Sequence, residues 1–208
     1  NMVYPFLFYL GFFTSISGIF FAVSQKDIKA ILAFHTISQI GLVLMSLAMN
    51  TDLGWIGAYT HTLNHFLFKS LLFLGAGVII NEYGVRKVTD IRGIGRNHPI
   101  FTVCMFFGIF AITGAPFSIG FLSKTIIKKS MMTGLQYWLF QVVSLGTMVS
   151  FVKFSTMFFG KSRICKKISV GQFFGVAIMA SLCVAAFVGE LGFMPEFFMI
   201  NGNILGEE

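Results

Sequence analysis

Residues 57–80 read Gly-Ala-Tyr-Thr-His-Thr-Leu-Asn-His-Phe-Leu-Phe-Lys-Ser-Leu-Leu-Phe-Leu-Gly-Ala-Gly-Val-Ile-Ile, an apolar run that carries three basic side chains, His61, His65 and Lys69. Lys69 is the one charged residue within it. About 20 mostly apolar residues cross a bilayer as a helix. An ionisable group at that depth costs at least ~2.5–3.5 kcal/mol. The stretch therefore predicts a membrane-spanning helix whose lysine serves a function.

The spacing of the three basic side chains indicates what that function is. Residues four apart on a helix drift only about 40° around its axis, so His61, His65 and Lys69 form one stripe. Neighbours in the stripe can touch directly or through one water. Histidine exchanges protons near neutral pH, and an apolar environment disfavours a charged lysine. The pattern favours a proton path, and the alternative is a set of hydrogen bonds that only hold helices together.

The composition places the whole chain in a membrane. The 208 residues are 56% hydrophobic and 11% charged, whereas globular domains carry about 25% charged residues. The net charge of +7 does not indicate nucleic-acid binding, because the basic residues lie in short loops between apolar runs. The widely spaced cysteines make no metal-binding pattern, and no nucleotide or haem motif is visible. We expect no metal, no cofactor and no catalytic site of an enzyme.

Six apolar runs predict an all-α membrane protein with six transmembrane helices, at residues 2–23, 30–50, 55–81, 98–123, 134–159 and 168–189. We expect residues 1–208 to form a single transmembrane domain, with a short interfacial tail at 190–208. Glu190 would end the sixth span at the interface, and no acidic residue would lie deep in any span. Because the first residue is Asn1, we expect a fragment or one piece of a split gene.

The fourth predicted span contains a break. It includes Gly114, Pro116 and Gly120 and then Lys124. Proline lacks an N–H and disfavours helix in the residue before it, and each glycine costs about 1 kcal/mol relative to alanine. The helix should therefore be discontinuous near 114–120. Broken backbone is tolerated in a membrane where protein or a watery cavity surrounds it, so Lys124 is a second candidate for ion transfer.

Basic loops predict the orientation. The loops at 24–29, 82–97 and 160–167 hold most of the lysines and arginines, and six spans put all three loops on one side. The positive-inside rule assigns that side to the cytoplasm or matrix. The short loop at 51–54 and both chain ends would lie on the opposite side.

Further polar residues extend the candidate path. His35 lies within the second predicted span and is followed by Ser38 and Gln39. They could continue the path inward or form a buried cluster that joins helices. Lys29 and Asp27 lie at the start of that span. The sequence leaves two alternatives for them, a role in ion transfer and helix capping. Lys153 lies near the cytoplasmic end of the fifth span, where snorkelling explains a lysine.

Four segments together resemble the antiporter-like, proton-translocating membrane subunits of respiratory complex I, Mrp-type sodium/proton antiporters and membrane-bound hydrogenases. These are residues 25–41, 61–74, 90–95 and 114–124, in family order. The resemblance implies that Lys69, with His61 and His65, is the central lysine of a half-channel. It implies that Lys124 exchanges protons with the outside, and that Lys29 and His35 lie near the cytoplasmic entry.

The resemblance also sets the expected size and context. Such subunits have about fourteen helices in two inverted halves, and this chain covers the C-terminal half. We expect a multi-pass subunit of an energy-transducing membrane (cell membrane or mitochondrial inner membrane), whose partner subunits supply the missing half and the redox energy. Its relay would move protons in a pump of the NADH:quinone or hydrogenase type. The alternatives are a scaffold fragment that transports nothing and an Mrp-type sodium/proton antiporter subunit.

Overall fold

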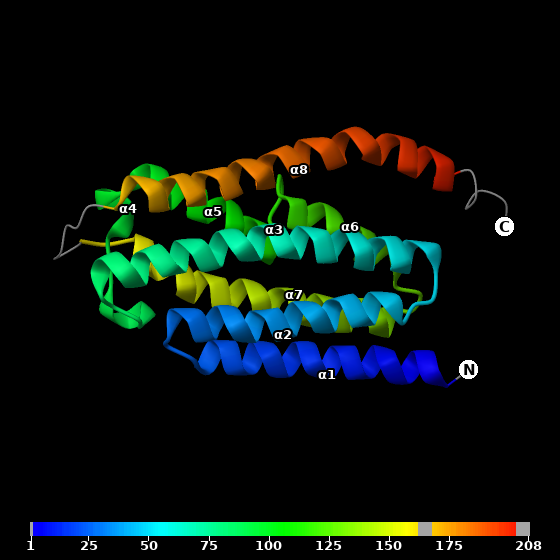
Figure 1. Ribbon diagram of the computed structural model, residues 1–208. Coiled ribbons are helices and arrows are strands. Elements are labelled where there is room, and N and C mark those ends of the chain that lie inside the picture. Colours follow the sequence, from blue (N-terminus) through cyan, green and yellow to red (C-terminus); the bar gives the residue numbers. More distant parts are fainter. Residues whose placement is uncertain (1, 162–167, 203–208) are drawn as a thin grey trace.

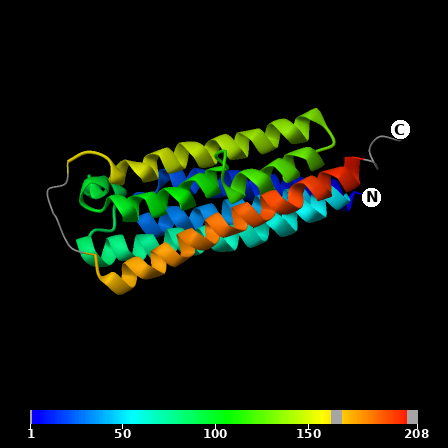
Figure 2. The ribbon, with the colours of Figure 1, turned by 90° about the horizontal axis from the view of Figure 1, so that it is seen from above.

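The computed structural model describes residues 2–161 and 168–202, with side chains described up to residue 192. Its helices are α1 (Val3–Ser24), α2 (Ile28–Leu47), α3 (Asp52–Tyr83), η1 (Val88–Asp90), α4 (Ile94–Asn97), α5 (Pro99–Thr113), α6 (Ile119–Ser130), α7 (Gly134–Ser155), η2 (Thr156–Phe158) and α8 (Val170–Gly202). The long helices run along one common direction (Figures 1 and 2).

Helix α3 is the centre of the bundle. It packs against α2, α5, α6 and α8, while α1 covers the other side of α2 and α7 touches α1, α2 and α5. The turn between α1 and α2, the segment from α3 to α5 and the start of α8 lie at one end of the bundle (Figure 1). The turn between α2 and α3 and the turn between α6 and α7 lie at the other end.

Five segments are long and apolar enough to cross a membrane, namely Val3–Ser24, Ile28–Leu47, Asp52–Tyr83, Gly134–Phe158 and Val170–Gly192. They correspond to five of the six predicted spans. The predicted fourth span is represented by two shorter helices, α5 and α6, separated by residues 114–118. The chain is thus an all-helical, multi-pass membrane protein.

The distribution of polar and apolar side chains is the reverse of that in a water-soluble protein. Large apolar side chains point outward along α1, where Phe6, Phe13 and Phe20 are each about two-thirds exposed. His35, Gln39, His61, Asn64, Lys69 and Lys124 are instead buried in the bundle. Lipid is as apolar as leucine, so polar groups gain most by meeting one another inside.

Small residues allow α1 and α2 to approach closely. A Cβ added at Gly11 would lie 2.7 Å from the Gly41 carbonyl oxygen, and one at Gly18 would lie 2.7 Å from the Ser38 amide nitrogen. Ser15 uses this proximity to donate a hydrogen bond to the Ser38 carbonyl at 2.8 Å. Close backbone packing and interhelical hydrogen bonds are what stabilise helix pairs in lipid.

Asp27 fixes the start of α2. Its Oδ1 accepts from the backbone N–H groups of Lys29 and Ala30, at 2.9 and 3.0 Å, and its Oδ2 pairs with Arg86 Nε at 3.1 Å. Burial alone would raise the pKa of Asp27, but these N–H groups and the arginine charge together lower it below the ordinary value. Of the two alternatives for this residue, function and helix capping, these contacts favour helix capping.

Helix α8 differs from the prediction at its far end. The sixth span was expected to end at residue 189 and to be followed by an interfacial tail from 190. The apolar span ends at Gly192, and the helix itself continues to Gly202. Gly189, Gly192 and Pro195 lie around this point, and α8 continues through all three. Residues 203–208 lie outside the described part of the chain, as do Arg163, Lys166 and Lys167 of the third basic loop.

Candidate functional site in the core of the bundle

His61 joins three helices. It lies on α3 with no exposed surface, its Nε2 lies 3.1 Å from Gln39 Oε1 of α2, and its Nδ1 lies 2.9 Å from Ser123 Oγ of α6. An amide oxygen only accepts, so Nε2 carries the hydrogen of the first bond. The Ser123 hydroxyl donates to Nδ1 when the ring is neutral.

The same contacts also suit a protonated ring. A serine hydroxyl both donates and accepts, so Ser123 can turn to accept from a protonated Nδ1. Its own hydrogen then points to the carbonyl of Ile119 or Gly120, each 3.3 Å from Ser123 Oγ. His61 can therefore gain or lose a proton without leaving a buried polar atom unpaired, which would cost about 1–3 kcal/mol.

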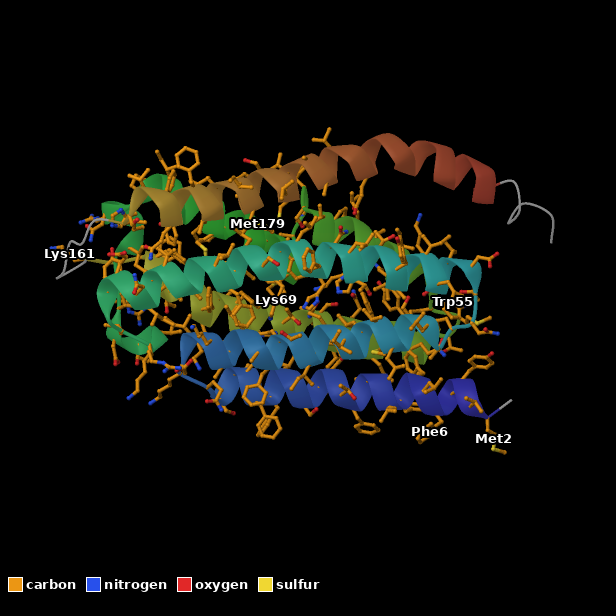
Figure 3. The ribbon with its side chains drawn as sticks, viewed as in Figure 1. Met2, Phe6, Trp55, Lys69, Lys161 and Met179 are labelled. Atoms are coloured by element: carbon orange, nitrogen blue, oxygen red, sulfur yellow. The ribbon has the colours of Figure 1, made fainter. Side chains whose placement is uncertain are left out.

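Lys69 points from α3 towards α2 in the interior of the bundle, whereas Phe6 points away from it (Figure 3). The lysine is only 7% exposed, and its Nζ donates to the Leu32 carbonyl of α2. The ring of Phe73 lies 5.4 Å from Nζ. A buried ammonium needs such partners because its desolvation costs several kcal/mol.

His65 lies between the other two members of the stripe on α3. It is buried, and its ring meets the edge of the Phe68 ring, with the centroids 5.4 Å apart. Its Nε2 is buried and has no hydrogen-bond partner among the described residues. One nitrogen of this histidine is therefore available to exchange a proton with a neighbouring group or a water.

Lys124 is placed by the interruption between α5 and α6. Its Nζ donates to the Ile112 carbonyl at 2.8 Å, in the last turn of α5. The last four carbonyls of a helix lack intrahelical partners, and the negative end of the helix dipole favours a cation. The lysine is buried, so the carbonyl groups at the end of α5 provide the hydrogen-bond acceptors that water provides to an exposed lysine.

Three predicted residues shape the interruption. Gly114 ends α5 with φ 77°, a left-handed conformation that costs glycine little, and a Cβ there would lie 2.8 Å from Lys124 Cδ. A Cβ at Gly120 would collide with the Ala111 carbonyl. Pro116 lies in the intervening turn, which is followed by Ser118, the N-cap of α6.

A polar cleft of about 180 Å³ opens beside Lys124. Its lining alternates between α6 and α7 and includes Lys128, Gln141 and Ser144. The Ser144 hydroxyl is buried without a hydrogen-bond partner among the described residues. The cleft gives the buried lysine a polar connection towards the end of the bundle that holds the turn between α6 and α7.

His35 lies on α2 between Leu32, which Lys69 contacts, and Gln39, which His61 contacts. Its Nε2 lies 2.7 Å from Ser150 Oγ of α7, and the Phe151 ring packs on it at 4.7 Å. Its Nδ1, Ser38 Oγ and Gln39 Nε2 are buried without hydrogen-bond partners among the described residues. These atoms leave a buried polar stretch between the histidine and the amide that contacts His61.

Two lysines lie outside this buried set. Lys29 is exposed at the start of α2, so the structure does not bring it into contact with the others. Lys153 donates to the carbonyls of Val23 and Gln25 at the end of α1. It therefore caps a helix end, which differs from the expected snorkelling towards the membrane surface.

Sequence reasoning missed three polar neighbours. Ser123 contacts His61 of the stripe, Ser150 contacts His35, and Asn64 donates to the backbone at the interruption. Each is a common residue in an apolar run. Ser123 precedes a candidate lysine, and Asn64 precedes a candidate histidine, which is the one signal that could have found them. We call His61, His65, Lys69 and Lys124 the buried basic row.

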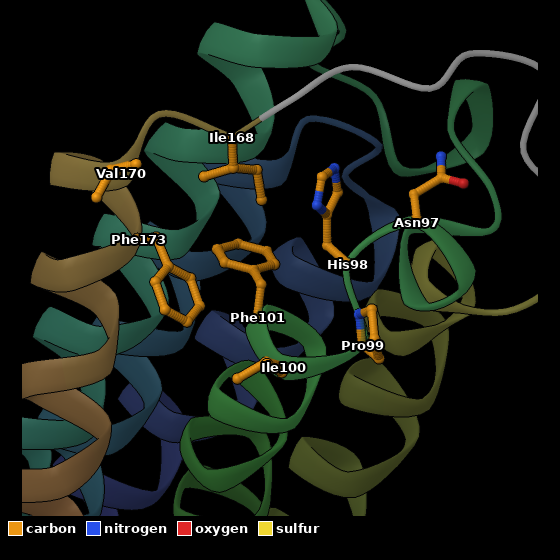
Figure 4. Close-up of a pocket in the computed structure, with 8 residues that line it drawn as sticks. All are labelled: Asn97, His98, Pro99, Ile100, Phe101, Ile168, Val170 and Phe173. Carbon is orange, nitrogen blue, oxygen red and sulfur yellow. The ribbon is translucent and has the colours of Figure 1, made fainter.

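A pocket at the end of the bundle with the basic loops is not part of the row. It is a pocket of about 290 Å³ between the start of α5 and the start of α8, with His98, Phe101, Ile168 and Phe173 in its lining (Figure 4). Most of its walls are apolar. It therefore offers no polar route to Lys69.

Comparison with known proteins identifies the chain. The family described as NADH:quinone oxidoreductase/Mrp antiporter, transmembrane region, matches residues 1–150. The chain belongs to this family. The buried basic row lies entirely within the matched residues, so the resemblance inferred from the four sequence segments is confirmed.

Curated relatives of this antiporter-like family come from different complexes. Formate hydrogenlyase subunit 3 of Escherichia coli K12 is 34% identical over 135 residues, 60% of this chain and 22% of the relative. A Na⁺/H⁺ antiporter component of Bacillus subtilis is 33% identical over 150 residues, 67% of this chain and 19% of the relative. NADH-ubiquinone oxidoreductase chain 5 of Mus musculus is 36% identical over 137 residues, 64% and 22%. The chain thus spans about a fifth of the length of these relatives.

Solved structures of antiporter-like complexes share the fold. A chain of the archaeal membrane-bound sulfane sulfur reductase matches with TM-score 0.84 and 28% identity, over 90% of this chain and 32% of that one. A chain of the Mrp complex from Dietzia sp. DQ12-45-1b matches with TM-score 0.81 and 20% identity, over 89% and 45%. The second likeness concerns the fold alone.

Proposed function

We propose that the chain is a proton-translocating half-channel of an antiporter-like subunit within a redox-driven pump. One observation carries this proposal: His61 contacts Gln39 and Ser123 in an arrangement that suits both its neutral and its protonated form. A merely structural histidine needs partners for one form only. A proton carrier needs them for both, because unpaired buried polar groups would oppose transfer.

The path would start near His35 and end at the cleft beside Lys124. Protons entering from the basic-loop end would reach Lys69 and His35, which lie about one turn of α2 apart, and continue to His65 and His61. Ser123 contacts His61, and water would link that pair to Lys124, the next residue on α6. Among the described residues, one ring nitrogen each of His35 and His65 has no hydrogen-bond partner, which supports water-mediated steps between these groups. Lys29 would act only at the mouth of the path.

We further propose that α5 and α6 together form a sixth, interrupted crossing. Helix α5 begins at the end with the basic loops, and α6 ends at the opposite end (Figure 1). Partner subunits would supply the energy source. Lys69 would then be driven by groups outside this chain.

Replacing Lys69 tests the proposal. General acid–base groups typically contribute about 10²–10⁴-fold, so Lys69→Ala should lower proton flux at least about tenfold in vesicles that contain the assembled complex. Lys161→Ala, which removes an exposed lysine, should leave flux unchanged, and both variants must assemble normally. Normal flux in assembled Lys69→Ala would refute the relay and favour the scaffold alternative.

The second candidate is an Mrp-type sodium/proton antiporter module. The observation that favours it is the 33% identity to a Na⁺/H⁺ antiporter component over 67% of this chain. The same vesicles distinguish the two functions. Proton flux that requires a sodium gradient and no electron donor would support the antiporter, whereas flux that requires the donor would support the pump.

A further inference from the structure

Helix α8 presents one row of side chains to the rest of the bundle. Val176, Ala180 and Cys183 are buried in the core, and Phe187 packs against it. These positions follow one another at intervals of four, three and four residues, which keeps them on one face of a helix. The next interval of three leads to Glu190, so a carboxyl occupies an inward position of an otherwise apolar row.

Glu190 lies opposite the interruption between α5 and α6. Its side chain lies near Asn64 on α3, and Asn64 Nδ2 donates to the Ile119 carbonyl at 3.0 Å. Ile119 is the first residue of α6. Asn64 thus connects the carboxyl to the broken backbone.

A cavity lies between the interruption and the turn of α8 that precedes Glu190. It has a volume of about 510 Å³, and its walls come from the interruption (Pro116, Phe117, Ser118) and from α8 (Val184, Phe187, Val188). Glu190 Oε2 is buried and has no hydrogen-bond partner among the described residues. The carboxyl is therefore only partly satisfied by the protein.

Glu190 lies near Asn64, within the row of basic residues on α3, although the apolar span of α8 ends two residues later, at Gly192. Asn64 precedes His65 on α3, between His61, which contacts Gln39, and Lys69, which contacts Leu32. Gln39 and Leu32 both lie within the α2 span Ile28–Leu47. An ionisable residue at this depth is rare without a function.

Positive charge on the buried basic row requires an acidic group nearby. The ionisable side chains on the elements around α8 include His61, His65 and Lys69 on α3, Cys104 on α5, and Lys124, Lys128 and Lys129 on α6. None of the fully buried residues that the structure describes is acidic. A basic row that binds a proton in the membrane gains uncompensated charge unless an acid nearby loses one.

We propose that Glu190 is the proton-exchanging carboxyl of this half-channel, seated at the broken helix through Asn64. A proton leaves the ammonium of Lys124 for the Glu190 carboxylate through intervening water. An amine and a carboxylic acid result, and the reverse transfer restores both charges. Glu190 lies beyond residues 1–150 that the family comparison covers, and this assignment rests on the proposed proton path.

Isosteric substitution in the assembled complex tests the assignment. Glu190→Gln keeps the shape and hydrogen bonding of the side chain but cannot ionise, so proton flux should fall about tenfold or more. Glu190→Asp should restore part of the flux. Asp52→Asn, the same change at an exposed carboxyl in the first turn of α3, should leave flux unchanged.

A spectroscopic measurement separates this assignment from the proposed function. Infrared difference spectra after a pH jump should contain a carboxyl C=O band that is present in the native protein and in Asp52→Asn and lost in Glu190→Gln. If that band is absent and Glu190→Gln has normal proton flux, the assignment of Glu190 is overturned. A loss of flux in Lys69→Ala would still support the proposed proton path. If Lys69→Ala transports normally, the path itself fails, whatever the band shows.

Discussion

Gly120, whose side chain is a single hydrogen atom, allows α5 and α6 to approach closely. A Cβ at Gly120 would collide with the Ala111 carbonyl, which is backbone and cannot rotate away. Gly120→Ala should therefore push α6 from α5 and disturb the Lys124 contact with Ile112. Overpacking typically costs about 1–3 kcal/mol, so unfolding in detergent should occur at lower denaturant concentration than in the native protein.

Gly77 is the matched control at this scale. It lies inside α3 with nothing within 4 Å of an added Cβ, so Gly77→Ala should be neutral or stabilising by up to about 1 kcal/mol. If the two variants unfold alike, the close approach at Gly120 does not hold the interruption together.

At the scale of one element, Asp27 stabilises the start of α2. Replacing an N-cap aspartate by alanine costs about 1 kcal/mol, and Asp27→Ala also removes the pair with Arg86. Because the pKa of Asp27 is lowered in the folded protein, its contribution is complete above the ordinary carboxyl pKa. It is lost as pH falls through the lower, folded value.

Unfolding measured between neutral and strongly acidic pH checks this element. The stability difference between the native protein and Asp27→Ala should be constant near neutral pH and should shrink only in strong acid. Asp90→Ala is the control, because the partner of that carboxylate is Thr89, its exposed neighbour in the chain. A difference that does not change with pH would show that the charge of Asp27 contributes nothing.

At the scale of the whole molecule, the ends of the bundle should face opposite compartments. Asp52 lies at the turn between α2 and α3, and Lys161 lies at the end with the basic loops (Figure 3). In a protein with Cys165 replaced by serine, a membrane-impermeant thiol reagent should label Asp52→Cys from outside and Lys161→Cys from the cytoplasmic or matrix side. Labelling of both from one side would contradict the interrupted sixth crossing.

The sequence by itself determined the membrane location, the stripe of His61, His65 and Lys69, and the chemistry that interrupts the chain at Gly114 and Pro116. These follow from local properties, namely the apolar length of a run, the helical period and the backbone limits of glycine and proline. The family followed from the motifs, because four segments in order carry far more information than any one of them.

Only the tertiary structure decided which groups meet. The helical period tells which side chains share a face of one helix, but not which helix packs on that face or at what height. That depends on tilt, on glycine contacts such as Gly11 with Gly41, and on the shape of the bundle. For this reason Ser123 opposite His61, Ile112 opposite Lys124 and Asn64 beside Glu190 emerge from the fold, while the stripe itself was readable from residues 57–80.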